Sequence, residues 1–218
     1  IAALKREHIV RGFKWTELHH LMGRDATRAL KRGLGPPRGA APLPLEQIVE
    51  ATPMGFVDVP LHWPAAGSAA AVVTTAWLTR EVEAASGFRR AVQLHAPDNE
   101  GSKSMGPCGW CSWELPVSKA DAEALGKTRS LACSCPSPSC PARAMRLTVE
   151  ASEGAWRECG GEGPPPPDWP LIIDGSGNPM TKQGMVVFFR ELCERASLPI
   201  TGISGHSARV EGAQRLAR

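Results

Sequence analysis

Apolar residues recur every three or four positions in several stretches of the chain, which is the spacing of one face of an α-helix. This spacing, together with the positions of glycine and proline, predicts helices over 15–32, 44–49, 72–85, 142–150 and 182–196. The last of these follows Thr181, a typical N-cap residue. It carries a broad apolar stripe that we assign to core packing: Met185, Val186, Phe188, Phe189, Leu192 and Cys193.

Three shorter stretches are typical of β-strands instead. They cover residues 91–95, 113–117 and 128–132. The polar turn Ser118–Asp121 and residues 122–127 separate the last two, which therefore predict a β-hairpin, and the first strand is expected to pair with the second. The expected fold class is α+β, a mainly helical domain with a small antiparallel sheet.

A segment rich in glycine and proline, Gly33–Pro42, interrupts the pattern between the first two predicted helices. It divides the chain into residues 1–41 and residues 42–218, and the second part is long enough to bury a core. The helix before the linker carries four basic residues near its C-terminal end, where they suit the helix dipole: Arg24, Arg28, Lys31 and Arg32.

Composition excludes only a few classes of function. The 218 residues carry a formal net charge of +3, which is compatible with a surface that faces phosphate but is too small to indicate nucleic acid on its own. The sequence has neither an apolar run that could span a bilayer nor a signal-peptide pattern. We therefore expect an intracellular protein with no membrane partner, nuclear if its source is eukaryotic and cytoplasmic otherwise.

The most specific motif lies in residues 204–218. A glycine leads into a predicted helix, and His206 and Arg209 are three positions apart, which places them on one face. A guanidinium stays charged and donates in a planar fork, while an imidazole exchanges protons near neutral pH, so the pair suits a phosphate that gains charge. The string G-H-S-x-R-x-x-G-A resembles box II of the tyrosine recombinases, the phage-integrase family.

This resemblance implies two earlier parts in a fixed order. Arg80 and Glu83 form an R-x-x-E pattern that resembles box I, although Trp77-Leu78-Thr79 replaces the usual small residues before the arginine. Lys119 lies in the predicted hairpin turn, where the family keeps a lysine. Taken singly, the arginine and glutamate are more typical of an ordinary ion pair on a surface helix, and the lysine of a solvated turn. The order of all these residues along the chain supports the resemblance.

The resemblance also implies roles for these residues. Two arginines, here Arg80 and Arg209, would stabilise the charge that develops on the scissile phosphate. Lys119 would protonate the leaving 5′ oxygen, His206 would assist proton transfer, and Glu83 would have a supporting role. The nucleophile of the family is a tyrosine, and this chain contains none. We therefore expect no DNA cleavage by the chain as given, which is either a C-terminally truncated piece, as the stop inside a helix favours, or a decayed relative.

Further expectations come from the same resemblance. It implies duplex DNA as the partner, a homotetramer on DNA in the intact protein, and no metal requirement for catalysis. Residues 42–218 would form an incomplete catalytic domain, and residues 1–41 would be the remnant of a helical DNA-clamping domain with its linker. The alternative for the basic helix end in the first part is that it is simply solvated.

Seven cysteines are the second unusual feature. A C-x-x-C pattern precedes the first hairpin strand and three further cysteines follow the second, so strand pairing brings both groups to one end. The candidate ligands of a structural zinc are Cys108, Cys111, Cys133 or Cys135, and Cys140. The alternative is a set of reduced thiols without metal, since disulfides are rare inside cells.

Three functions are consistent with these patterns. The favoured one is DNA recombination or integration by strand exchange in the intact protein of a mobile element, with DNA binding in this chain. The second is a catalytically dead DNA-binding relative. The third is a zinc-stapled nucleic-acid-binding module in which the His-x-x-Arg pattern is incidental.

Overall fold

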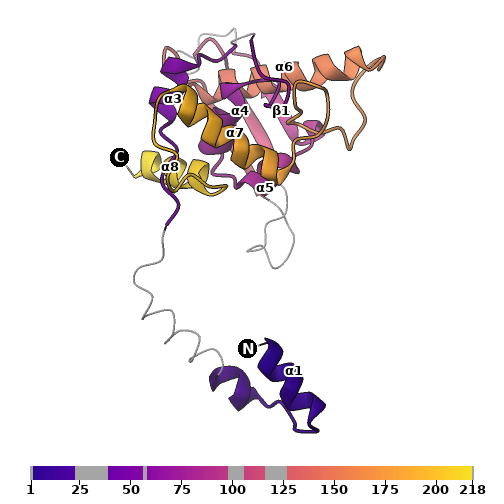
Figure 1. Cartoon of the computed structure of the whole chain (residues 1–218). Coiled ribbons are helices and arrows are strands. Elements are labelled where there is room, and N and C mark those ends of the chain that lie inside the picture. The colour runs from indigo at the N-terminus through magenta and orange to yellow at the C-terminus, as the bar shows by residue number, and fades with distance from the viewer. Residues whose placement is uncertain (1, 23–38, 56–57, 98–105, 116–126, 218) are drawn as a thin grey trace. The chain divides into compact units, whose positions relative to one another are not determined.

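The computed structural model describes residues 2–22, 39–55, 58–97, 106–115 and 127–217 (Figure 1). The chain divides into two compact units, Ile1–Gly39 and Ala40–Arg218, and the division falls near the boundary expected between residues 41 and 42.

The first unit begins with α1, Ala2–Val10, a helix that the apolar pattern did not predict. Residues 17–22 are also helical and belong to the helix expected over 15–32. Residues 23–38, which include the four basic residues at the end of that predicted helix, lie outside the described part of the chain.

The second unit is built around α4, Ser68–Ala76, whose residues are buried as far as Thr75. Its first half is rich in alanine, which lets neighbouring helices approach closely. Three helices pack against it: α3 (Leu45–Ala51), α6 (Pro141–Glu158) and α8 (Ser207–Leu216). None of the described helices has the length and apolarity that crossing a bilayer requires.

The broad apolar stripe predicted for residues 182–196 lies on α7, Lys182–Arg195, which packs against α3 and α5 (Glu81–Ala85). The Gly184 N–H donates a hydrogen bond of 2.9 Å to the Thr181 hydroxyl, so the predicted N-cap is confirmed. The buried residues of α7 belong to the core, as expected: Met185, Phe188, Phe189, Leu192 and Cys193.

The described strands form one antiparallel sheet in the order β1-β2-β3, which confirms an α+β fold with a small sheet. They are β1 (Val92–His95), β2 (Trp110–Leu115) and β3 (Lys127–Ala132), and a short 3-10 helix, Arg89–Ala91, precedes the first. Val92 is opposite Trp113, and Leu115 is opposite Lys127. The helix α6 packs against β2 and β3.

The helix expected over 72–85 is not continuous. It is interrupted between α4 and α5, where Leu78 adopts a positive φ of 56° that an α-helix does not contain. The Thr79 N–H and hydroxyl both bond to the Thr74 carbonyl oxygen, at 3.0 and 3.1 Å, and so close the end of α4. Arg80 therefore precedes the first turn of α5 and does not lie in the middle of a helix.

The turn between α4 and α5 is attached to the sheet. The indole N–H of Trp77 donates to the Arg129 carbonyl at 3.2 Å, and the Arg129 guanidinium donates to the Trp77 carbonyl. Trp77 also meets Trp113 edge to face, with ring centroids 6.3 Å apart. The β2–β3 hairpin is thus fastened directly to the segment that leads into Arg80.

Candidate functional site

The first part of the candidate site is a closed pair between Arg80 and Glu83. The Oε2 atom of Glu83 accepts the Arg80 backbone N–H at 2.8 Å, and its Oε1 atom accepts the guanidinium Nε and Nη2 at 2.9 and 2.6 Å. The Glu83 side chain is only 10% exposed, whereas that of Arg80 is 23% exposed. The pair is therefore not the solvated ion pair on a surface helix that the isolated pattern suggested.

This pairing fixes the charge of both groups. The hydrogen bond to Glu83, together with the negative charge of Glu83, raises the pKa of Arg80. Burial acts to raise the pKa of Glu83, but hydrogen bonds from Arg80 and the positive charges of Arg80 and Arg209 outweigh it and lower that pKa. A charged guanidinium is consequently held in one orientation without being fully covered.

The second part of the candidate site surrounds the start of α8. The Ser204 N–H donates to the Ser207 hydroxyl at 2.9 Å, and the His206 N–H donates to the Ser204 hydroxyl at 3.3 Å. Ser207 and Ala208 are buried, while His206 and Arg209 are exposed. The buried pair anchors the helix so that the imidazole and the guanidinium face outward.

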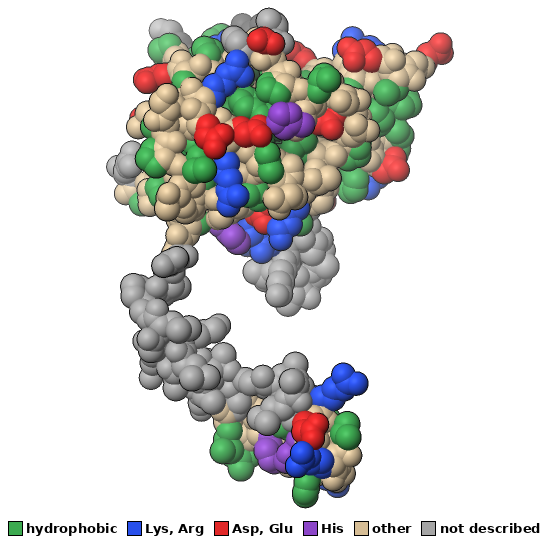
Figure 2. All heavy atoms as spheres, in the orientation of Figure 1, with side chains coloured by type: hydrophobic (Ala, Val, Ile, Leu, Met, Phe, Trp, Pro, Cys, Tyr) green, Lys and Arg blue, Asp and Glu red, His purple; other side chains and the backbone are tan. Residues whose placement is uncertain are grey.

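The fold brings these two distant segments together. The backbone N–H of Glu81 donates to the Gly205 carbonyl oxygen at 3.2 Å. Arg209 lies close enough to Glu83 to lower its pKa. We call this meeting point the box junction, and it comprises Arg80, Glu81, Glu83, Gly205, His206 and Arg209. On the side of the unit below α5 and α8, the space-filling view shows a histidine gathered with lysine or arginine side chains (Figure 2).

Glycines permit the close approach at two points of this packing. A Cβ on Gly205 would overlap the carboxyl group of Glu81, and a Cβ on Gly212 would overlap the Thr75 carbonyl oxygen of α4. Both positions therefore need a residue without a side chain. The two glycines of the G-H-S-x-R-x-x-G-A string therefore allow α8 and the residues before it to pack closely against α4 and Glu81.

Sequence reasoning missed two charged residues beside the junction. The Glu81 side chain is 7% exposed, and its Oε1 atom lies 3.7 Å from the Nζ atom of Lys182 at the start of α7. Within the described part of the chain, its Oε2 atom is buried without a hydrogen-bond partner. Neither Glu81 nor Lys182 belongs to a sequence motif, and their proximity is seen only in the folded chain. The predicted Lys119 lies outside the described residues, in the segment that joins β2 to β3.

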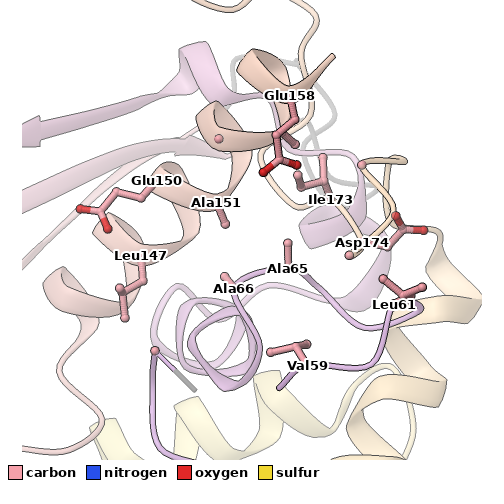
Figure 3. Close-up of a pocket in the computed structure, with 15 residues that line it drawn as sticks. Val59, Leu61, Ala65, Ala66, Leu147, Glu150, Ala151, Glu158, Ile173 and Asp174 are labelled. Atoms are coloured by element: carbon pink, nitrogen blue, oxygen red, sulfur yellow. The ribbon is translucent and has the colours of Figure 1, made fainter. Parts of the chain in front are cut away.

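A groove of about 540 Å³ lies elsewhere on the same unit (Figure 3). Val59, Leu61 and Ile173 contribute apolar surface to it. Three carboxylate residues line it: Glu150, Glu158 and Asp174. Neither Arg80 nor Arg209 is among its lining residues. Carboxylates repel phosphate, so this groove is not suited to the DNA backbone.

The cysteine cluster is a second candidate site. Among the described residues, the Sγ atoms of Cys108, Cys133, Cys135 and Cys140 all lie within 4.8 Å of one another. The expected ligand set included only one of the two cysteines at 133 and 135, whereas the structure brings both to the cluster. This arrangement is compatible with a structural metal site.

The expected ligand Cys111 does not join this cluster. The strand β2 begins at Trp110, three residues before the expected strand, so Cys111 lies within the sheet and is 1% exposed. Its Sγ donates to the Leu131 carbonyl oxygen at 3.8 Å, and burial raises the pKa of its thiol to about 12. Cys111 is therefore a core thiol, and the prediction that it is a metal ligand is corrected.

The thiols of the cluster differ in their protonation. Burial acts to raise the pKa of Cys133, but hydrogen bonds from the backbone N–H groups of Cys135 and Cys108 outweigh it and lower that pKa to about 7. Burial raises the pKa of both Cys108 and Cys135. Of these three thiols, Cys133 forms a thiolate most readily.

No family model, curated protein or solved structure matches this chain. The box junction and the cysteine cluster are the two groups of residues whose chemistry points to a function.

Proposed function

We propose that the box junction binds the phosphate backbone of duplex DNA, and that a protein containing this domain and a tyrosine nucleophile carries out strand exchange as tyrosine recombinases do. The observation that carries the proposal is the meeting of the two boxes through the Glu81–Gly205 hydrogen bond. It sets a charged, oriented Arg80 beside an exposed Arg209 and His206.

The chemistry follows from these groups. A nucleophile attacks phosphorus, the bond to the 5′ oxygen breaks, and charge increases on the non-bridging oxygens. Glu83 holds the Arg80 guanidinium in place, so that it offers preorganised donors to those oxygens, and the exposed Arg209 would add a second guanidinium. His206 would assist proton transfer at the nucleophile or the phosphate, and Lys119 would donate a proton to the leaving 5′ oxygen.

DNA binding without strand exchange is the second candidate. The observation that favours it is the composition, because none of the 218 residues is tyrosine. In this chain the junction would then hold DNA, and cleavage would need a nucleophile from elsewhere. Under either function the cysteine cluster would hold a structural zinc that takes no part in the phosphoryl transfer.

The proposal is tested by the salt dependence of binding to a labelled DNA duplex. Each phosphate contact contributes about 0.9 to the slope of log affinity against log salt. Arg80→Ala and Arg209→Ala should each weaken binding and reduce that slope by about one contact. Arg157→Ala is the matched control, because Arg157 is an exposed arginine on α6 whose Nε bonds to the Glu153 carbonyl of its own helix.

The expected result is a weaker, less salt-dependent complex for the two junction variants and an unchanged one for the control. Equal affinities and slopes in all three variants would contradict the proposal. So would the absence of duplex binding by the unaltered chain at low salt.

A further inference from the structure

The four clustered cysteines come from three separate segments of the chain. Cys108 lies in the turn before β2, Cys133 and Cys135 follow β3, and Cys140 immediately precedes α6. The Cys108 and Cys135 sulfurs are 3.6 Å apart, and the Cys133 and Cys140 sulfurs are 3.7 Å apart. All four are free thiols.

These separations match a metal-centred tetrahedron. Zinc binds thiolate sulfur at about 2.3 Å, and four such bonds at the tetrahedral angle place the sulfurs about 3.8 Å apart. Two edges of the cluster are therefore already close to the required length. Four thiolates in this geometry suit a soft divalent ion and not magnesium or calcium, which prefer oxygen ligands.

The surrounding backbone supports sulfur atoms that carry negative charge. The Cys135 N–H donates to the Cys133 sulfur at 3.3 Å, and the Ser134 N–H donates to the Cys140 sulfur at 3.3 Å. Such outer hydrogen bonds orient metal ligands and stabilise the thiolate form. A Cβ on Gly106 would lie 2.8 Å from the Cys133 sulfur, which is too close. The backbone can therefore approach this sulfur only because residue 106 is a glycine.

A cation lies beside the cluster. The Arg146 guanidinium on α6 donates to the Cys108 carbonyl at 2.9 Å and to the His95 carbonyl at 2.6 Å. A zinc ion with four thiolates carries two net negative charges, which a neighbouring guanidinium partly balances. The same two bonds hold the turn that carries Cys108 against α6.

We propose that Cys108, Cys133, Cys135 and Cys140 bind one zinc ion, and that this ion fastens the turn before β2, the end of β3 and the start of α6 to one another. The site lies at the end of the sheet where β2 begins and β3 ends. Its role is structural, because four protein ligands leave no open position for a substrate. The zinc site would form whether or not the chain binds DNA.

The first test is the metal content of the purified full chain. Elemental analysis should find one zinc per chain in the unaltered protein and in Cys111→Ser, which alters a core thiol outside the cluster. Cys133→Ser and Cys140→Ser should lose most of that zinc. The proposal is overturned if the unaltered protein holds no stoichiometric zinc, holds stoichiometric iron instead, or loses zinc equally in Cys111→Ser and Cys133→Ser.

A second measurement uses the unaltered chain, so it does not depend on whether a variant folds. Cobalt(II) added to metal-free protein should give the absorption bands of a tetrahedral four-thiolate site, and one equivalent of zinc should abolish them. Alkylation followed by mass spectrometry should then modify the exposed Cys159 but protect the four ligands in the zinc-loaded protein. Equal alkylation of Cys159 and Cys133 in the presence of zinc would refute the site.

Discussion

The backbone N–H of Glu81 donates a hydrogen bond of 3.2 Å to the carbonyl oxygen of Gly205. Glu81 follows Arg80 directly, and Gly205 precedes His206 directly. One main-chain bond therefore joins the segments of two predicted functional residues, Arg80 and His206, which lie far apart in the sequence. A main-chain link fixes positions better than long side chains can, because no rotamer freedom has to be lost.

Gly205→Ala is expected to destabilise the protein. The new Cβ would overlap the carboxyl group of Glu81, which is buried and cannot swing away into solvent. Such overpacking typically costs about 1–3 kcal/mol. The free energy of unfolding, measured by urea denaturation, should fall by that amount, and duplex DNA affinity should fall with it because the junction is displaced.

Gly154→Ala provides the control for this substitution. Gly154 lies in α6, and a Cβ there would meet no atom within 4 Å. Alanine in a helix interior is favoured over glycine by about 0.5–1 kcal/mol, so this variant should be as stable as the unaltered chain or more stable. If both glycine substitutions gave the same stability, the packing described at Gly205 would be wrong.

The stability contributed by Glu83 should depend on pH. Its pKa lies below the ordinary value of 4.5 because the hydrogen bonds and charge of Arg80 outweigh burial. A carboxylate with a lowered pKa stabilises the folded state fully above its unfolded pKa and loses this effect as the pH falls through the folded value. Glu83→Gln removes the charge, so at neutral pH it should lower the free energy of unfolding by about 1–3 kcal/mol.

The difference between the unaltered chain and Glu83→Gln should therefore be largest above pH 4.5 and shrink as the solution becomes more acidic. Urea denaturation at a series of pH values measures it. Glu114→Gln is the control, because it removes an exposed carboxylate on β2 and leaves the Arg80–Glu83 pair intact. If the stability difference between the unaltered chain and Glu83→Gln grew toward acid pH, the lowered pKa of Glu83 would be contradicted.

Local patterns predicted most of the helices and all three described strands, but not the break between α4 and α5. The apolar run from Val72 onward continues past Leu78 without a glycine or proline, so nothing in it marks the end of a helix. The break arises from tertiary contacts: Trp77 packs on Trp113 and bonds to Arg129 of the sheet. Such contacts override helix propensity and are not visible along the sequence.

The candidate sites show the same limit. Motif spacing nominated Arg80, Glu83, His206 and Arg209 as candidates, since each lies within a few residues of its motif partner. It did not identify Glu81, whose neighbour Gly205 is far away in the chain. For the cysteines, the start of β2 decides whether Cys111 can be a metal ligand. Because the strand begins three residues earlier than expected, Cys111 lies in the core. Strand boundaries are among the least certain features of a sequence pattern.

Arg215→Ala tests how α8 is held in place. The Arg215 guanidinium donates to Glu211 at 3.1 Å, to Glu46 at 2.8 Å and to the Ser139 hydroxyl at 3.3 Å. Ser139 immediately precedes Cys140, so this arginine links α8 to the cysteine cluster. Its loss would leave the Glu211 carboxylate, only 11% exposed, without its partner, which should cost about 1–3 kcal/mol.

The comparison with Glu46→Ala separates the two ion pairs of Arg215. The Glu46 side chain is 68% exposed, and exposed pairs contribute only about 0–1 kcal/mol. Thermal or urea denaturation should therefore show a large loss for Arg215→Ala and a small one for Glu46→Ala. If the two losses were equal, the surface pair would account for the whole effect of Arg215. The contacts with Glu211 and Ser139 would then contribute nothing to the position of α8.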